Sequence, residues 1–235
     1  MIDLRRPRIA VVTFPGSNDD RDAVHALDLL GADTRPVWHA EEQLPDVDAV
    51  VLPGGFSYGD YLRCGALARF APVMRAVTAF AADGGLVLGI CNGFQVLCEA
   101  GLLPGVLRPN TSLSFVCRDV SLRVESVSTP FTSRCEPRQR LLIPVKHGEG
   151  CWTYPEERLA ELDDAGQVVV RYEPGESPNG SVADVAGVVN AEGNVMGLMP
   201  HPEHAVDGLL GSTDGALILG SLVDAARDRL ATAAA

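Results

Sequence analysis

The sequence predicts an α/β protein with a mostly parallel central sheet flanked by helices. In roughly the first hundred residues, short β-branched apolar runs alternate with helix-like amphipathic segments. Glycine or proline follows most of these runs, as at strand-to-helix turns. Continuous apolar strands are typical of parallel sheets, because helices cover both faces. The second half contains longer, partly alternating runs, which predict an additional antiparallel strand region.

The first half contains four strand-like segments, at residues 8–14, 34–39, 48–52 and 85–90. Helices are predicted between or after them, at 17–30, 69–82 and 92–100. Ser17 is a candidate N-cap of the first helix, and Gly31 and Gly101 are suited to end the first and the third. This regular β–α alternation predicts parallel strands joined by crossover helices.

The second half is expected to contribute strands at 115–127, 141–145 and 168–172, with a short helix at 153–162. Two further strands, at 185–189 and 195–199, flank the sequence AEGN, which is typical of a hairpin. A last helix is predicted at about 213–231, followed by a tail at 231–235 that we expect to fray. Without a repeat or a linker, residues 1–235 are predicted to form a single domain.

Composition limits the possible functions. The 235 residues are 46% apolar and carry a net charge of −12, which allows a large core and disfavours nucleic acid and anionic membranes as partners. We find no run of about 20 apolar residues and no signal peptide, so a cytoplasmic protein is expected. The six cysteines show neither CxxC pairs nor zinc-ligand spacing, which predicts mostly free and usually buried thiols.

One cysteine stands at the predicted junction of a strand and a helix, in the sequence Gly89-Ile90-Cys91-Asn92-Gly93. Glycines two residues away on either side are typical of a nucleophile elbow, a sharp turn that only small neighbours fit. The helix N-terminus favours the reactive thiolate, and the Asn92 N–H is suited to stabilise an oxyanion. The alternative is a buried strand-end cysteine with incidental glycines.

A glycine pair, Gly54-Gly55, follows the third predicted strand within the sequence PGGFSYGD. Ligands of open α/β sheets bind beyond the carboxyl ends of the strands, where glycine exposes backbone N–H groups. The pair is therefore a candidate second oxyanion donor, although a tight turn without a ligand fits equally. Cys64 lies nearby, but it lacks an elbow and is expected to pack.

A base and an acid that could orient it occur together in Met199-Pro200-His201-Pro202-Glu203-His204. The two prolines favour an extended backbone, from which His201 and Glu203 project in the same general direction. A cysteine nucleophile needs such a pair. A solvated surface loop and a metal site formed by His201, Glu203 and His204 are the alternatives; we expect no metal.

A fourth motif, PVKHGEG at 144–150, combines charge and glycine at a strand end, although alone it fits any polar loop. Together, the motifs resemble the class I (triad) glutamine amidotransferases, whose fold is flavodoxin-like. Within that family, the glutaminase subunits of phosphoribosylformylglycinamidine synthase are most similar, because a generic amidotransferase would lack the block FSYGDYLRCG at 56–65. The resemblance covers nearly the whole chain and includes FPGSN at 14–18, GICNGFQ at 89–95, NGS at 179–181 and MPHPE at 199–203.

The resemblance implies a role for each matching residue. Cys91 matches the nucleophile, His201 the general base and acid, and Glu203 the group that orients the histidine. The remaining assignments are Gly55 and Asn92 as backbone oxyanion donors and Gln95, His147 and Gly54 in the substrate pocket. The sequence departs from the family pattern at Asp19, where members often carry cysteine, and at His204, where they often carry arginine.

The resemblance also implies a reaction and partners. Such subunits hydrolyse L-glutamine to glutamate and ammonia and channel the ammonia to a large synthetase subunit. The synthetase uses ATP to convert formylglycinamide ribonucleotide to formylglycinamidine ribonucleotide in purine biosynthesis, often with a small bridging subunit. Because this chain has no Walker A motif, ATP and Mg²⁺ are expected on the synthetase, and no cofactor is expected on this chain.

Three other functions are weighed against this prediction. The first is an amidotransferase subunit of another pathway, such as histidine or pyridoxal phosphate synthesis, which the FSYGDYLRCG block disfavours. The second is a hydrolase with an α/β-hydrolase elbow, in which the acid usually precedes the histidine, whereas Glu203 follows His201. The third is a catalytically inactive binding subunit, which the intact trio of cysteine, histidine and glutamate disfavours.

Overall fold

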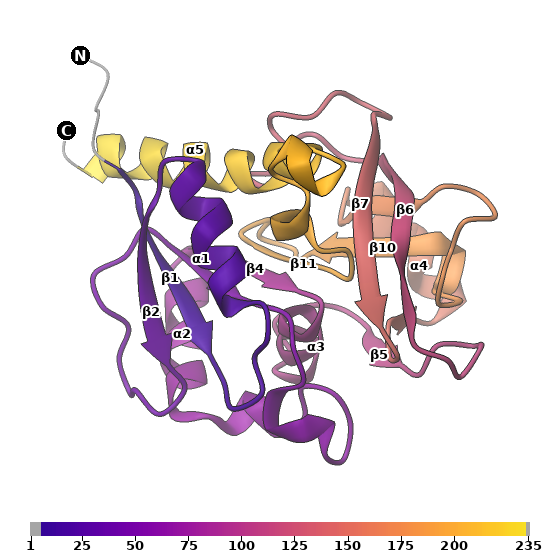
Figure 1. Cartoon of the computed structure of the whole chain (residues 1–235), viewed down its shortest axis with the longest axis horizontal. Coiled ribbons are helices and arrows are strands. Elements are labelled where there is room, and N and C mark those ends of the chain that lie inside the picture. Colours follow the sequence, from indigo (N-terminus) through magenta and orange to yellow (C-terminus); the bar gives the residue numbers. More distant parts are fainter. Residues whose placement is uncertain (1–5, 234–235) are drawn as a thin grey trace.

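The computed structural model describes residues 6–233. They contain a nine-stranded mixed sheet with the strand order β2-β1-β3-β4-β11-β10-β9-β6-β7 (Figure 1). The strands β2, β1, β3, β4 and β11 are parallel, and every pair from β11 to β7 is antiparallel. This arrangement confirms the predicted α/β class with a parallel first half and an antiparallel second region.

The strands are short where the sheet is parallel, and all of them except the edge strand β2 are mostly apolar and buried. The parallel strands are β1 (Arg8–Thr13), β2 (Asp33–Trp38), β3 (Ala49–Leu52), β4 (Leu86–Ile90) and β11 (Val195–Leu198). The antiparallel strands are β10 (Val185–Val189), β9 (Val168–Tyr172), β6 (Val116–Val124) and β7 (Arg140–His147). Every residue of β3 and β4 is buried, because helices cover both faces there.

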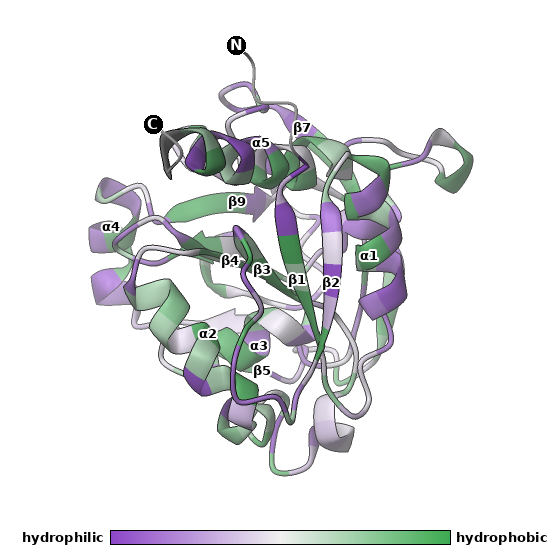
Figure 2. Ribbon diagram, turned by 90° about the vertical axis from the view of Figure 1, so that its left-hand side faces the viewer, coloured by the Kyte–Doolittle hydropathy of each residue, from purple (hydrophilic) through white to green (hydrophobic). Residues whose placement is uncertain are grey.

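Helices pack on both faces of the parallel region (Figures 1 and 2). Helix α1 (Asp20–Leu29) lies on one face and contacts α5 (Gly215–Ala233). Helices α2 (Pro72–Ala82) and α3 (Asn92–Glu99) lie on the other. Helix α4 (Glu156–Asp164), in the antiparallel half, is mostly hydrophilic in Figure 2 and buries only Leu162. The main core is therefore the apolar interior between the sheet and its helices.

Several local predictions need correction. The helix predicted at 69–82 is a short 3₁₀ turn followed by α2, because Ala71 precedes Pro72 and adopts an extended ψ of 143°. Ser17 does not cap the first helix; its Oγ accepts a hydrogen bond from the Phe14 N–H (2.9 Å), and Asp19 occupies the N-cap position.

The helix predicted at 153–162 also begins later than expected. The helix starts at Glu156, after a short strand β8 (Cys151–Thr153) that pairs with β5 (Val106–Arg108) in a separate two-stranded sheet. Neither short strand is predicted from the sequence. At the C-terminus, α5 continues through Ala233; the expected fraying at 231–235 falls partly on 234–235, outside the described residues.

Two general expectations can be examined across the fold. All six cysteines are free thiols, as predicted. Among residues 6–233, no helix combines the length and the apolar character needed to cross a membrane.

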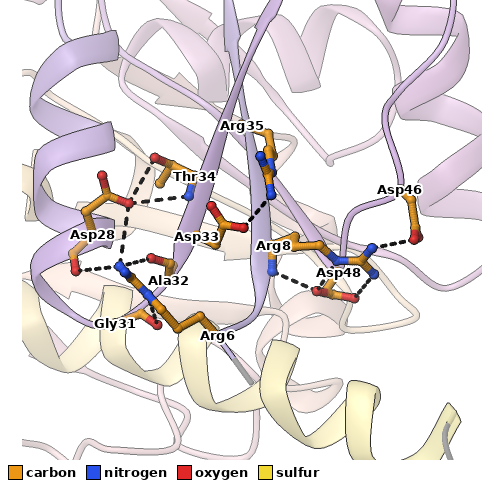
Figure 3. A network of polar contacts seen from close by, with 10 residues as sticks. All are labelled: Arg6, Arg8, Asp28, Gly31, Ala32, Asp33, Thr34, Arg35, Asp46 and Asp48. Atoms are coloured by element: carbon orange, nitrogen blue, oxygen red, sulfur yellow. Dashed lines mark hydrogen bonds and ion pairs between the residues drawn. The ribbon is translucent and has the colours of Figure 1, made fainter. Parts of the chain in front are cut away.

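The two ends of the parallel strands carry different polar groups. At the amino ends of β1 and β2, arginines and aspartates form a network near the surface (Figure 3). The Arg8 N–H donates to Asp48 Oδ2 (2.7 Å), and its guanidinium contacts Asp48 and Asp46. The loops that contain the sequence motifs lie at the opposite, carboxyl ends of the strands.

Candidate active site

Loops after three parallel strands, β1, β3 and β4, meet at the carboxyl ends of the sheet, and the β7–β8 turn joins them. They enclose a cavity of about 210 Å³. Its lining residues are Asn18, Asp19, Gly55, Phe56, Asp60, Cys64, Cys91, Gln95, Phe115, Lys146, His147, Gly148 and Glu149. This is where open α/β sheets bind ligands.

Cys91 stands on a sharp turn between β4 and α3. Its backbone has φ 50° and ψ −104°, a conformation that a side-chain-bearing residue adopts only when its surroundings impose it. A Cβ on Gly93 would lie 2.0 Å from the Leu52 carbonyl oxygen, and one on Gly89 would lie 2.7 Å from the Gly93 backbone. The two glycines thus allow the strand and helix to approach each other, which is the geometry of a nucleophile elbow.

His201 and Glu203 meet directly. His201 Nδ1 lies 2.6 Å from Glu203 Oε1, and both side chains are buried. The expectation of an extended backbone is wrong, because Pro202–His204 forms a 3₁₀ turn that brings the two side chains together. The His201 N–H donates to the Pro144 carbonyl (2.8 Å) of β7, which fixes the start of this turn.

The charge state of His201 depends on its neighbours. Burial lowers the pKa of His201, but the charges of Glu203 and Cys91 outweigh burial and raise it to about 10. The Nε2 atom makes no hydrogen bond within the described residues, and the Cys91 Sγ instead donates to the Lys146 carbonyl (3.9 Å). Contacts between a nucleophile and its base often tighten only when substrate binds.

The two expected oxyanion donors lie beside Cys91. Gly55 lines the cavity, and Asn92 is the first residue of α3, so its N–H has no acceptor within the helix. The Asn92 side chain joins the two loops: its Oδ1 accepts a hydrogen bond from the Ser57 N–H (3.1 Å), and its Nδ2 donates to Gln95 Oε1 (2.8 Å). These hydrogen bonds fix the position of the loop that contains Gly55 relative to the turn that contains Cys91.

Gln95 and His147 both line the cavity, where the sequence places the substrate pocket. The Gln95 Nε2 donates to the Glu149 carbonyl (2.6 Å). His147 lies between Asn110 Oδ1 (3.2 Å from Nδ1) and Asn179 Nδ2 (3.5 Å from Nε2). Burial, reinforced by the charge of His201, lowers the pKa of His147 to about 4, so its imidazole is neutral at physiological pH.

Two residues near the cavity differ from their expected surroundings. Gly54 does not line the cavity; it lies behind it, against Asp19 and His201. Cys64 is buried, but it faces the cavity and does not simply pack in the core. Burial and the nearby carboxylates of Asp60 and Glu149 raise the pKa of the Cys64 thiol far above its usual range, so Cys64 stays protonated.

Sequence reasoning assigns no role to three charged residues of the cavity, Asp60, Lys146 and Glu149. Burial raises the pKa of Asp60, and the charge of Glu149 acts in the same direction. All three lie inside glycine-containing motifs at strand ends. Their position in these motifs is the sequence signal that could have identified them as candidate site residues.

Asp19, His201, Glu203 and His204 each offer a ligand atom within 4.8 Å of the others. The set contains the three residues that the sequence offered as an alternative metal site, together with the Asp19 carboxylate. His201 is already paired with Glu203, and Asp19 forms an ion pair with Lys146, so a cation would have to displace the lysine amine. The two pairs form a charge network beside Cys91.

Comparisons with known proteins agree with this geometry. Residues 6–214 match the family described as CobB/CobQ-like glutamine amidotransferase domain. Phosphoribosylformylglycinamidine synthase subunit PurQ of Salinibacter ruber is 56% identical over 225 residues, which cover 92% of this chain and 96% of the relative. The same subunit of Mycobacterium bovis is 59% identical over 219 residues, or 93% and 97% of the two chains.

A solved structure is similar as well. A chain in the structure of PurLQS from Thermotoga maritima superposes with a TM-score of 0.86 at 44% identity, over 94% of this chain and 99% of that one. The chain therefore belongs to the CobB/CobQ-like glutamine amidotransferase family and, within it, to the PurQ subunits of phosphoribosylformylglycinamidine synthase.

Proposed function

We propose that Cys91, His201 and Glu203 hydrolyse L-glutamine in the cavity at the carboxyl ends of the strands. The observation that carries this proposal is the strained Cys91 elbow next to a buried His201–Glu203 pair. The Cys91 thiolate attacks the side-chain amide carbon of glutamine. The oxyanion that forms accepts hydrogen bonds from the backbone N–H groups of Gly55 and Asn92.

The tetrahedral intermediate collapses when His201 gives a proton to the amide nitrogen. The carbon–nitrogen bond breaks, ammonia leaves, and a γ-glutamyl thioester remains on Cys91. His201 then takes a proton from water, whose oxygen attacks the thioester carbon; the carbon–sulfur bond breaks and glutamate is released. Glu203 holds the His201 ring in place and stabilises its protonated form, as the 2.6 Å contact with Nδ1 supports.

The substrate is held by the other groups of the cavity. Asp60 and Glu149 face the cavity with carboxylates, which suit the α-ammonium group of glutamine. Gln95 and His147 fix the shape of the pocket, because their side chains are bonded to neighbouring protein groups. Cys64 faces the same space, but burial and the neighbouring carboxylates of Asp60 and Glu149 raise its thiol pKa, which disfavours it as a nucleophile.

The ammonia is proposed to pass to a large synthetase subunit, with a small bridging subunit in the same complex. Similarity to a chain in the PurLQS structure supports this assembly. ATP and Mg²⁺ are proposed to bind the synthetase, which converts formylglycinamide ribonucleotide to formylglycinamidine ribonucleotide. No cofactor is proposed on this chain. Six free thiols fit a reducing compartment, and we propose that the complex acts in the cytoplasm.

The test is to assemble the chain with its synthetase and to compare the wild type with Cys91→Ala and Cys117→Ala. Cys117 is an exposed cysteine and serves as the matched control. We expect Cys91→Ala to abolish glutamate release and glutamine-dependent amidation but to retain amidation with ammonium salts. Cys117→Ala should behave as the wild type. Glutamine-dependent amidation by Cys91→Ala at the wild-type rate would contradict the proposal.

A further inference from the structure

Asp19 occupies the N-cap of α1, but its side chain does not cap the helix. Aspartate at this position usually accepts hydrogen bonds from the first backbone N–H groups of the helix. The Asp19 carboxylate is instead buried, with 3% of the residue exposed, and points toward the active site. Burying an ionised carboxylate is costly unless it is paired, so its partners indicate its purpose.

The partners come from two other strand ends. Asp19 Oδ1 forms an ion pair with Lys146 of β7 and lies 3.3 Å from His204 Nε2. Asp19 Oδ2 lies 3.8 Å from His201 Nδ1. Asp19 and His204, which are far apart along the chain, are therefore in contact.

Gly54 makes this approach possible. A Cβ at Gly54 would lie 2.4 Å from Asp19 Oδ2 and 2.7 Å from His201 Cε1. Any side chain here would separate the carboxylate from the imidazole. Glycine is therefore required at position 54 by the close approach of Asp19 to His201, and not by contact with the substrate.

Titratable groups from several elements surround His201 or its partner Asp19. Glu203 and His204 belong to its own turn, Asp19 comes from the β1–α1 loop, and Lys146 from β7. Cys91 and His147 also act on its charge or respond to it. Burial alone would raise the pKa of Asp19, but His204, His201 and Lys146 hold it well below its usual range, so Asp19 is ionised at neutral pH.

We propose that Asp19 is a second positioning carboxylate for His201, which stabilises the imidazolium that protonates the leaving ammonia, while Lys146 and His204 hold it in place. This inference rests on the proposed function. Glu203 acts through a direct hydrogen bond, and Asp19 acts through its charge, because 3.8 Å is beyond hydrogen-bonding distance. Lys146 weakens the effect of Asp19 on His201, because the lysine ammonium partly neutralises the Asp19 carboxylate.

The proposal predicts opposite effects for the two partners. Asp19→Asn removes a negative charge, so the imidazolium loses its proton at lower pH and the basic limb of kcat/KM moves down. Lys146→Gln removes the opposing positive charge, so the same limb moves up. An opposite charge within about 4–6 Å shifts a pKa by about 1–3; because Lys146 screens Asp19, we expect limb shifts of roughly 0.5 to 1 pH unit.

The experiment measures kcat/KM for glutamine hydrolysis from pH 6 to 11 in the complex with the synthetase. The variants are Asp19→Asn, Lys146→Gln and Asp22→Asn, an exposed aspartate of the same helix, as control. Asp19→Asn should lose about three- to tenfold in kcat/KM above the new limb, and Asp22→Asn should match the wild type. A purely structural role would lower the rate evenly at all pH values.

The outcomes separate this inference from the function on which it rests. An inactive wild type would refute the proposed function itself. An active wild type whose basic limb is unmoved in both variants, or moves the same way in both, overturns the role of Asp19 alone. If Asp19→Asn does not fold, as its circular dichroism would reveal, the upward shift in Lys146→Gln decides the question.

Discussion

The sheet carries a network of ion pairs at each end, and the two networks differ mainly in burial. At the amino ends of β1 and β2, the Arg8 side chain is 30% exposed and its partner Asp46 is 86% exposed. At the carboxyl ends, His201 and Glu203 are 1% and 0% exposed. Exposed pairs are screened by water and contribute little, whereas buried pairs determine which groups carry protons. Ion pairs of similar chemistry thus hold neighbouring segments together at the amino ends and support catalysis at the carboxyl ends.

The topology explains why the reactive network is at the carboxyl ends. Parallel strands bring the loops after β1, β3, β4 and β11 to one edge. Helix α3 begins there, directly after Cys91, so the partial positive charge of its N-terminus lies at the nucleophile. The cavity beside the amino-end network of Figure 3 is lined, among the described residues, by Arg6, Arg8, Asp33, Asp46 and Leu230, none of which is a nucleophile.

Removing one carboxylate from each network should give the largest contrast. Glu203→Gln keeps the shape of the side chain but loses the charge that supports His201. We expect kcat for glutamine hydrolysis to fall by about 10²- to 10⁴-fold, as when the acid of a catalytic triad is neutralised. Asp46→Asn at the amino end should leave kcat unchanged. Equal effects of the two substitutions would remove the distinction between the networks.

Acid should destabilise the carboxyl end first. The pKa of His147 is lowered from 6.5 to about 4, so the unfolded chain binds this proton before the folded one. Stability is therefore fully present above pH 6.5 and is lost as pH falls toward 4, by about 3 kcal/mol at most.

Urea unfolding at pH 7 and pH 4.5 would measure this loss. His147→Gln should reduce the difference in unfolding free energy between the two pH values. Arg8→Ala should leave that difference unchanged, because an arginine stays charged throughout this range. If His147→Gln shows the wild-type pH dependence, His147 does not account for the acid sensitivity.

The elbow should be sensitive to a single methyl group. Gly93→Ala places a Cβ 2.0 Å from the Leu52 carbonyl oxygen, so α3 must shift away from β3. Overpacking of this kind costs about 1–3 kcal/mol, and the shift should also displace Cys91 and lower kcat. Gly208→Ala is the matched control, since its Cβ would meet nothing within 4 Å. Unfolding free energies that are equal for both variants would contradict the close packing at the elbow.

The smallest effect is expected at the amino end. Arg8→Ala removes the guanidinium contacts with Asp46 and Asp48, but the backbone N–H at position 8 still donates to Asp48. We expect the unfolding free energy to fall by about 1 kcal/mol or less, with glutamine hydrolysis unaffected. A large loss of activity in this variant would mean that the two ends are coupled.

The sequence predicts the strands of the parallel region and the triad because both depend on local patterns. Apolar runs mark buried strands, and Cys91 and His201 lie in recognisable strand-end motifs. The Asp19 network is not predictable in this way, since Asp19 lies 127 residues from Lys146 and 185 residues from His204 along the chain. The short β5–β8 sheet escapes prediction because three-residue strands carry no periodic signal.

The central claim is that Cys91, and not its neighbour Cys64 in the same cavity, is the nucleophile. A chloroketone analogue of glutamine, which alkylates a thiolate within the pocket, tests it directly when the modified peptide is identified by mass spectrometry. We predict one adduct, on Cys91, which excess glutamine prevents and which Cys91→Ala does not form. An adduct on Cys64, or one that persists in Cys91→Ala, would contradict the account.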